Sequence, residues 1–143
     1  MDKKIIFGSD HAGFDLKNVL IEYVKEMGFD VEDIGNFSHE SCDYPVIAKD
    51  AAKKVLEQKC LGILVCGTGT GMAIAANRFK GIRAAVLSDT CSARMSRSHN
   101  DANVLCLGAR IIGNELAKDI VKIWLSVDFL GGRHTKRVDM LDD

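Results

Sequence analysis

The chain of 143 residues is 47% apolar and 27% charged, with a formal net charge of −1. These values are ordinary for a folded protein with a hydrophobic core, so residues 1–143 are expected to form a single domain. The even balance of charge argues against nucleic acid and against a membrane surface as partners, and no segment approaches the roughly 20 apolar residues of a membrane span.

Short apolar runs alternate along the chain with segments of helical periodicity. The runs predict strands at residues 5–7, 31–34, 61–66, 82–87 and 104–107. Helical spacing predicts helices over residues 16–27, from 45 to about 58, over 72–76, from about 90 to 99, and over 113–127. Gly28 is placed to end the first helix and Pro45 to open the second. Residues after Leu130 are expected to form a basic tail.

Because these runs are apolar throughout and do not alternate, we expect a sheet that is covered on both faces. The alternation of strand and helix predicts parallel strands joined by right-handed crossovers. The predicted fold is an α/β, Rossmann-like three-layer sandwich of about five parallel strands with helices on both faces and a C-terminal basic tail. Ligands bind beyond the carboxyl ends of the strands in such folds, and we expect three features of this sequence to lie there together.

The first feature is the segment Gly67-Thr68-Gly69-Thr70-Gly71, between a buried strand and a helix. Glycine lets the backbone approach a ligand closely, and the N–H groups at a helix start favour negative charge. The spacing fits neither a dinucleotide-binding fingerprint nor a Walker loop. The segment is therefore either an anion-binding loop or a tight turn without a ligand.

The second feature is Cys66, the last residue of the strand before that loop. Most free cysteines in apolar strands are small buried hydrophobes, but a thiol beside a helix start can become a thiolate that acts as a base or nucleophile. No comparable setting exists for Cys42, Cys60, Cys91 and Cys106. The odd total of five cysteines and the lack of Cys-x-x-Cys spacing predict neither disulfides nor zinc. Together with an N-terminus that lacks a secretory signal core, this predicts a cytoplasmic protein.

The third feature is a pair of histidine-bearing loops. Asp10 can orient the imidazole of His11 in one loop, and His99 in the other can exchange protons near neutral pH. The four histidines have no metal-ligand spacing, so neither a metal nor another cofactor is expected.

The basic tail is a fourth candidate. It carries Arg133, His134 and Arg137, and Arg110 follows the last predicted strand. Such a tail is either merely solvated or binds phosphate, for which arginine offers two parallel N–H donors. A tail that leaves the last helix can also reach the site of a neighbouring subunit, which implies an oligomer.

Several motifs occur in chain order: Gly8–Gly13, Asp43–Pro45, Cys66–Gly71, Ala75–Asn77, Gly81–Ala84, Ser98–Asn103 and Gly131–His134. Together they resemble type B ribose-5-phosphate isomerase, in the family that also holds the galactose-6-phosphate isomerase subunits. The resemblance runs nearly the whole chain. It implies a metal-free aldose–ketose isomerase of the pentose phosphate pathway that interconverts ribose 5-phosphate and ribulose 5-phosphate. It also implies a homodimer or homotetramer whose active site is shared between subunits.

The resemblance implies catalytic roles for Cys66, Thr68, His99 and Asp10. Cys66 is then the base that moves a proton between C2 and C1 through an enediolate, which the loop N–H groups and Thr68 stabilise, and His99 opens the sugar ring. Contacts to the sugar phosphate are implied for His11, Asp43, Tyr44, Gly67, Gly69, Thr70, Gly71, Asn100, Arg110, Arg133, His134 and Arg137. One branch of the family has a glutamate base just after the loop. This chain has Met72 there, which favours the cysteine mechanism.

Two other functions are compatible with the same residues. A six-carbon substrate, allose 6-phosphate or galactose 6-phosphate, needs only a deeper pocket. A non-catalytic module that binds sugar phosphates uses the same loop as an anion cradle, and it predicts binding without turnover.

Overall fold

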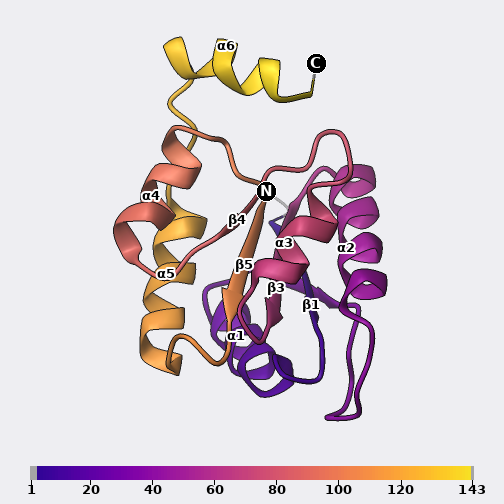
Figure 1. Ribbon diagram of the computed structural model, residues 1–143. Helices are drawn as coiled ribbons and strands as arrows, with labels where there is room; N and C mark the ends of the chain where they lie inside the picture. Colours follow the sequence, from indigo (N-terminus) through magenta and orange to yellow (C-terminus); the bar gives the residue numbers. More distant parts are fainter. Residues whose placement is uncertain (1–2, 143) are drawn as a thin grey trace.

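The computed structural model describes residues 3–142, which form a parallel sheet between two layers of helices (Figure 1). The elements in chain order are β1 (Lys4–Ser9), α1 (Phe14–Glu26), β2 (Asp30–Asp33), α2 (Tyr44–Gln58), β3 (Leu61–Cys66), α3 (Thr70–Ala76), β4 (Ala84–Val86), α4 (Thr90–Ser98), β5 (Val104–Gly108), α5 (Asn114–Ser126), α6 (Arg133–Asp139) and a 3₁₀ turn at Met140–Asp142. The Rossmann-like sandwich predicted from the sequence is confirmed.

The strand order places the three most apolar strands at the centre of the sheet. Across the part of the chain that the structure describes, the order is β2-β1-β3-β5-β4, and every neighbouring pair is parallel. Phe7 of β1 lies beside Ile63 of β3, which in turn lies beside Leu105 of β5. The carboxyl ends of these strands therefore meet at one edge of the sheet.

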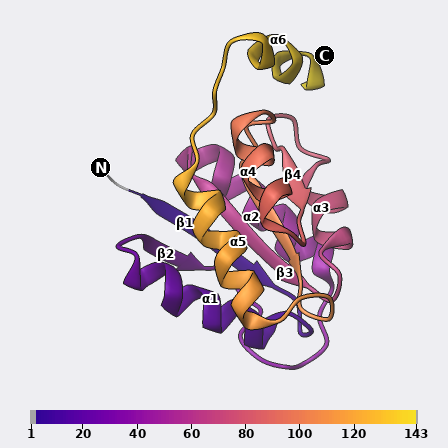
Figure 2. The ribbon, with the colours of Figure 1, turned by 90° about the vertical axis from the view of Figure 1, so that its left-hand side faces the viewer.

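Alternate residues of the central strands point into two separate cores, because successive side chains of a strand face opposite sides. Phe7 and Ile63 pack against α1 and α5, where Trp124 is fully buried. Leu64 and Cys106 pack against α2 and α3 on the other face. Figure 2 shows α1 and α5 over the first face. The two cores explain why β1, β3 and β5 are continuously apolar.

The edge strands differ from the prediction. β2 covers Asp30–Asp33, not residues 31–34, and its sequence is largely polar. The strand accommodates polar residues because it is only partly buried, and Glu32 forms an ion pair with Lys4 of β1 at 2.7 Å. β4 covers Ala84–Val86, not residues 82–87, because the Arg83 N–H donates to Asn103 Oδ1 at 2.7 Å before the ladder begins. The expectation of apolar runs throughout is therefore wrong for β2.

The predicted tail is instead a short helix, α6, after Gly131 and Gly132, whose φ angles are +68° and +58°. None of the residues described for α6 is buried. The helix lies apart from the body, beyond the end of the sheet where β1 begins (Figures 1 and 2). Two hydrogen bonds tie its flanking residues to the body, since the Leu130 N–H donates to Ser98 O and Asp142 accepts from the Gly81 N–H. The helix itself contacts the body through His134, whose ring stacks on His99. Among the helices between residues 3 and 142, none has the length and apolar character to cross a membrane.

Candidate active site

The loop between β3 and α3 presents a thiol to a backbone donor. Cys66, which ends β3, is 6% exposed, and the Gly69 N–H donates to its Sγ at 3.1 Å. Gly69 has a φ of +85°, a conformation that favours glycine, and a Cβ there would lie 3.1 Å from the Leu107 backbone. Thr68 and Thr70 are exposed on the same loop, and the Thr70 N–H donates to Thr68 Oγ1 at 3.3 Å. A donor held at the sulfur stabilises negative charge on it.

The β1–α1 loop lies beside this thiol. The Asp10 N–H donates to Val65 O at 3.2 Å, and Asp10 Oδ1 accepts from the Gly13 N–H at 3.0 Å, so the 8% exposed carboxylate is fixed at the start of α1. The Cys42 N–H donates to His11 Nδ1 at 3.3 Å. A neutral His11 therefore carries its proton on Nε2 and offers that nitrogen as a donor.

Residues from two further elements contact the loop between β3 and α3. Tyr44 begins α2, directly after the exposed Asp43, and packs so tightly on Gly71 that a Cβ there would lie 2.6 Å from the tyrosine ring. On the β5 side, the Arg110 N–H donates to Gly67 O at 3.0 Å, and the Arg110 guanidinium runs alongside Gly67. The carboxyl edge of the sheet thus gathers a thiol, an anion-stabilising loop, an imidazole and an arginine.

A second cluster of predicted residues lies elsewhere. The rings of His99 and His134 stack with centroids 4.3 Å apart and planes at 13°. With Asn100 and Arg137, they line a cavity of about 240 Å³ between α6 and the end of α4. Arg133 is the first residue of α6. Loss of hydration, helped by the neighbouring His99 and the two arginines, lowers the pKa of His134 below its usual value.

The two clusters lie at opposite edges of the sheet, so the expectation that both histidine loops share one edge is wrong. The pairing of β3 with β5 shows this, because Val104 lies beside Gly62 whereas Gly108 lies beside Cys66. His99 precedes β5 and is therefore near the amino edge, about 13 Å of strand away from Cys66 at 3.3 Å per residue. A loop that leads into a parallel strand always lies at that edge.

Comparison with known proteins identifies the family. Residues 5–141 match the model of a family described as Ribose/Galactose Isomerase. The chain belongs to this family. Ribose-5-phosphate isomerase B of Escherichia coli is 50% identical over 140 residues, which are 97% of this chain and 94% of that protein.

Solved structures agree with this Ribose/Galactose Isomerase assignment. A ribose 5-phosphate isomerase from Thermotoga maritima matches with a TM-score of 0.96 at 49% identity, over 99% of both chains. Ribose-5-phosphate isomerase B from Mycoplasma genitalium, with bound ribulose-5-phosphate, matches with a TM-score of 0.95 at 40% identity, over 99% of this chain and 95% of that one.

In this Ribose/Galactose Isomerase chain, one supporting residue escaped the sequence reasoning. Lys17 of α1 is fully buried, and its Nζ lies 2.7 Å from both Asp33 Oδ1 and Asn36 O. Lys17 therefore fixes Asp33 and Asn36, where the loop between β2 and α2 begins. The same loop carries Cys42, whose N–H donates to His11. The sequence does indicate that this lysine is buried, because Lys17 lies at helical spacing from Leu20, Ile21 and Val24 on the apolar face of α1. No three His, Cys, Asp or Glu side chains gather as a metal site between residues 3 and 142.

Proposed function

We propose that this chain interconverts ribose 5-phosphate and ribulose 5-phosphate through an enediolate, with Cys66 as the base. The observation that carries the proposal is the sulfur of Cys66 facing the Gly69 N–H at the carboxyl edge of the sheet. The similarity to the E. coli enzyme over 97% of this chain supports the substrate, as does the match to the M. genitalium structure with bound ribulose-5-phosphate.

The chemistry divides between the thiolate and its loop. Cys66 removes the C2 proton of the open-chain aldose, the C2–H electron pair forms the C1–C2 double bond, and the carbonyl electrons move to O1. A proton passes from O2 to O1, the C2 carbonyl forms, and C1 takes the proton back from Cys66. The loop N–H groups and the Thr68 hydroxyl stabilise the oxyanion, where losing one donor typically costs about 10²–10³ in rate.

Ring opening and substrate binding use the remaining residues. His99 moves a proton between the O1 hydroxyl and the ring oxygen, acting as a general acid and base. Asp10, beside the loop, holds sugar hydroxyls. The other contacts to the sugar and its phosphate come from His11, Asp43, Tyr44, Gly67, Gly69, Thr70, Gly71, Asn100, Arg110, Arg133, His134 and Arg137.

Each active site is made by two chains, one giving the Cys66 cluster and the other giving the His99 cluster. The opposite placement of the clusters along β3 and β5 supports this arrangement. So does α6, which buries none of its described residues and is followed by the exposed Met140 and Leu141, 60% and 63% accessible. Sedimentation should give a mass of two or four 15.6 kDa chains. A monomer that turns over substrate contradicts the shared site.

The test of the function is ketose formation from ribose 5-phosphate by the purified chain, before and after exhaustive EDTA treatment. We expect turnover that EDTA does not reduce. A folded chain without turnover contradicts the proposal, and allose 6-phosphate and galactose 6-phosphate are then the substrates to test. Phosphate-ligand binding without turnover of any of these sugars identifies a binding module.

The five cysteines, all within the described residues, are free thiols, which fits the reducing cytoplasm.

A further inference from the structure

The turn between α4 and β5 carries His99 and Asn100 and has an unusual main-chain path. Asp101, the next residue, has a φ of +49°. Within residues 3–142, Lys59 is the only other non-glycine residue with a positive φ. This conformation is unfavourable for most L residues and persists where the surroundings impose it. The contacts that impose this φ on Asp101 therefore also fix the path of the turn.

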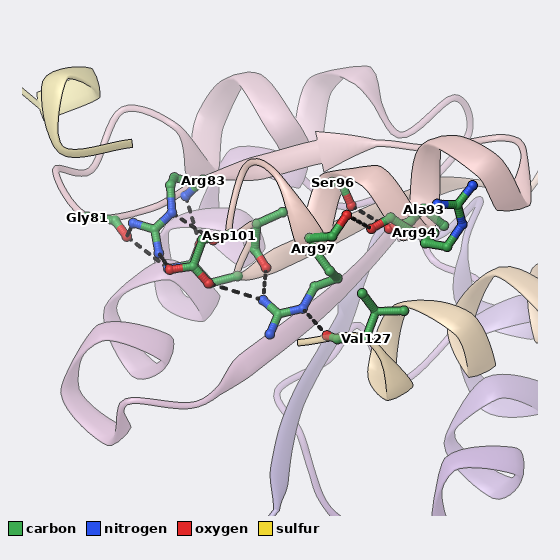
Figure 3. A network of polar contacts seen from close by, with 11 residues as sticks. Gly81, Arg83, Ala93, Arg94, Ser96, Arg97, Asp101 and Val127 are labelled. Carbon is green, nitrogen blue, oxygen red and sulfur yellow. Dashed lines mark hydrogen bonds and ion pairs between the residues drawn. The ribbon is translucent and has the colours of Figure 1, made fainter. Parts of the chain in front are cut away.

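Arg83, just before β4, holds Asp101 from one side (Figure 3). Its Nε donates to the Asp101 backbone oxygen at 2.7 Å, and its Nη2 donates to Asp101 Oδ2 at 3.3 Å. Arg83 is itself held, because its N–H donates to Asn103 Oδ1 and its Nη1 donates to Gly81 O at 3.2 Å. The contact thus ties the turn to the start of the neighbouring strand.

Arg97, in the last turn of α4, holds Asp101 from the other side. Its Nη1 donates to Ala102 O and lies 3.6 Å from Asp101 Oδ1. Its Nε donates to Val127 O at 3.3 Å, and its guanidinium lies over the ring of Trp124, 5.4 Å from the centroid. The Arg97 side chain is 13% exposed, so water competes weakly for these contacts. Figure 3 shows Asp101 between the two arginines.

These contacts act on the backbone that presents His99. Both arginines bond to main-chain oxygens of the turn, and the Asp101 carboxylate is their common partner. Rotation of the turn would move the His99 ring away from its stack on His134. A small displacement of a catalytic group has a large effect, since about 1 Å can cost about 10²-fold in rate.

We propose that Asp101, clamped between Arg83 and Arg97, is a positioning residue that orients His99 for opening of the sugar ring. The inference rests on the proposed isomerase function and adds a residue to it. Asp101 does not touch the substrate. It acts through the turn, so its effect on turnover passes through His99.

The test compares Asp101→Gly with Lys59→Gly. Glycine accepts the positive φ at both positions, so the first variant removes the clamped carboxylate without straining the backbone. Lys59 is exposed at the end of α2 and serves as the matched control. We expect Asp101→Gly to lower kcat for ribose 5-phosphate about tenfold, and Lys59→Gly to leave it unchanged. Both should keep a cooperative thermal transition.

A double-mutant cycle separates positioning from general loosening. In a His99→Asn background, Asp101→Gly should lower kcat by no more than about twofold, because the group that it positions is already gone. A full tenfold loss in that background, or wild-type kcat in the single variant, overturns the proposal.

A readout that does not depend on turnover is the Hε1 resonance of His99, assigned with His99→Asn. It should shift in Asp101→Gly and stay in place in Lys59→Gly. An unchanged resonance also overturns the positioning role. If the wild-type chain fails to isomerise ribose 5-phosphate while this resonance moves as expected, the proposed function fails and the positioning role stands.

Discussion

The Gly69 N–H donates to the Sγ of Cys66 across 3.1 Å, within one loop that joins β3 to α3. The contact needs the left-handed backbone of Gly69, whose φ is +85°. The loop also passes close to β4 and β5, since a Cβ on Gly69 would lie 3.2 Å from Val86 and 3.1 Å from the Leu107 backbone. The position of the donor is therefore set by the sheet itself.

Gly69→Ala should lower kcat for ribose 5-phosphate by about 10²-fold, because the N–H moves away from the sulfur and from the oxyanion. The matched control is Gly28→Ala. Gly28 has a φ of +97°, and no atom lies within 4 Å of the position that a Cβ would take, so its replacement adds a similar backbone strain without a clash near the site. Steady-state kinetics would contradict this prediction if both variants kept wild-type kcat.

Two strongly impaired variants should restore activity when their chains are mixed. Cys66→Ala and His99→Asn damage opposite sides of the shared site, so a mixed dimer has one site with both residues intact. Random exchange makes half of the dimers mixed, and we expect about a quarter of wild-type activity. The assay is ketose formation after joint refolding. Cys66→Ala mixed with Gly69→Ala should stay inactive, and activity there would refute the division of the site.

Lys17→Met should lower the free energy of unfolding by about 3 kcal/mol, because it leaves Asp33 and the Asn36 carbonyl without their buried cation. Urea unfolding measures the change. The control on the same helix is Lys25→Met, whose side chain is 54% exposed and lies 3.9 Å from Glu22. That change should stay within about 0.5 kcal/mol. Equal effects of the two substitutions would rule out the anchoring role of Lys17.

Glu32 should contribute to the pH dependence of stability. Hydrogen bonds from Lys4, and then from Gln58, lower its pKa from 4.5 to about 2. Because the folded pKa is depressed, its contribution is complete above pH 4.5 and is lost as the pH falls toward 2. Glu32→Gln should lower the free energy of unfolding by about 0.5–1 kcal/mol at pH 7 and by almost nothing near pH 2. The effect at pH 7 is small because water screens the carboxylate, which is 30% exposed. Urea unfolding at both pH values tests this against Glu22→Gln, which should show no such trend.

The apolar pattern was enough to predict the central strands but not the edges. Ile63 and Leu64 of β3 are fully buried on opposite faces of the sheet, so hydrophobicity alone marks such a strand. Glu32 stands in a strand because of its ion pairs with Lys4 and Lys54, which no hydropathy pattern reports. α6 escaped prediction for a related reason, because none of its described residues is buried to create an apolar stripe.

The placement of the candidate site residues was only partly predictable from the sequence. Cys66 and its glycine loop lie where the strand-to-helix pattern puts them. His99 was expected beside them, although its place before β5 already implies the other edge. The clamp on Asp101 depends on Arg83, 18 residues away in the sequence, and local patterns carry no information on such a contact.

The strand order has a consequence for a chain that is still being synthesised. β4 leaves the ribosome before β5, yet β5 lies between β3 and β4 in the sheet. Until residues 104–108 emerge, β3 exposes one edge of unpaired N–H and C=O groups and β4 has no neighbouring strand. The last strand must insert itself between two that are already present. Exposed strand edges of this kind attract other chains, so this interval is when a nascent chain most needs protection from aggregation.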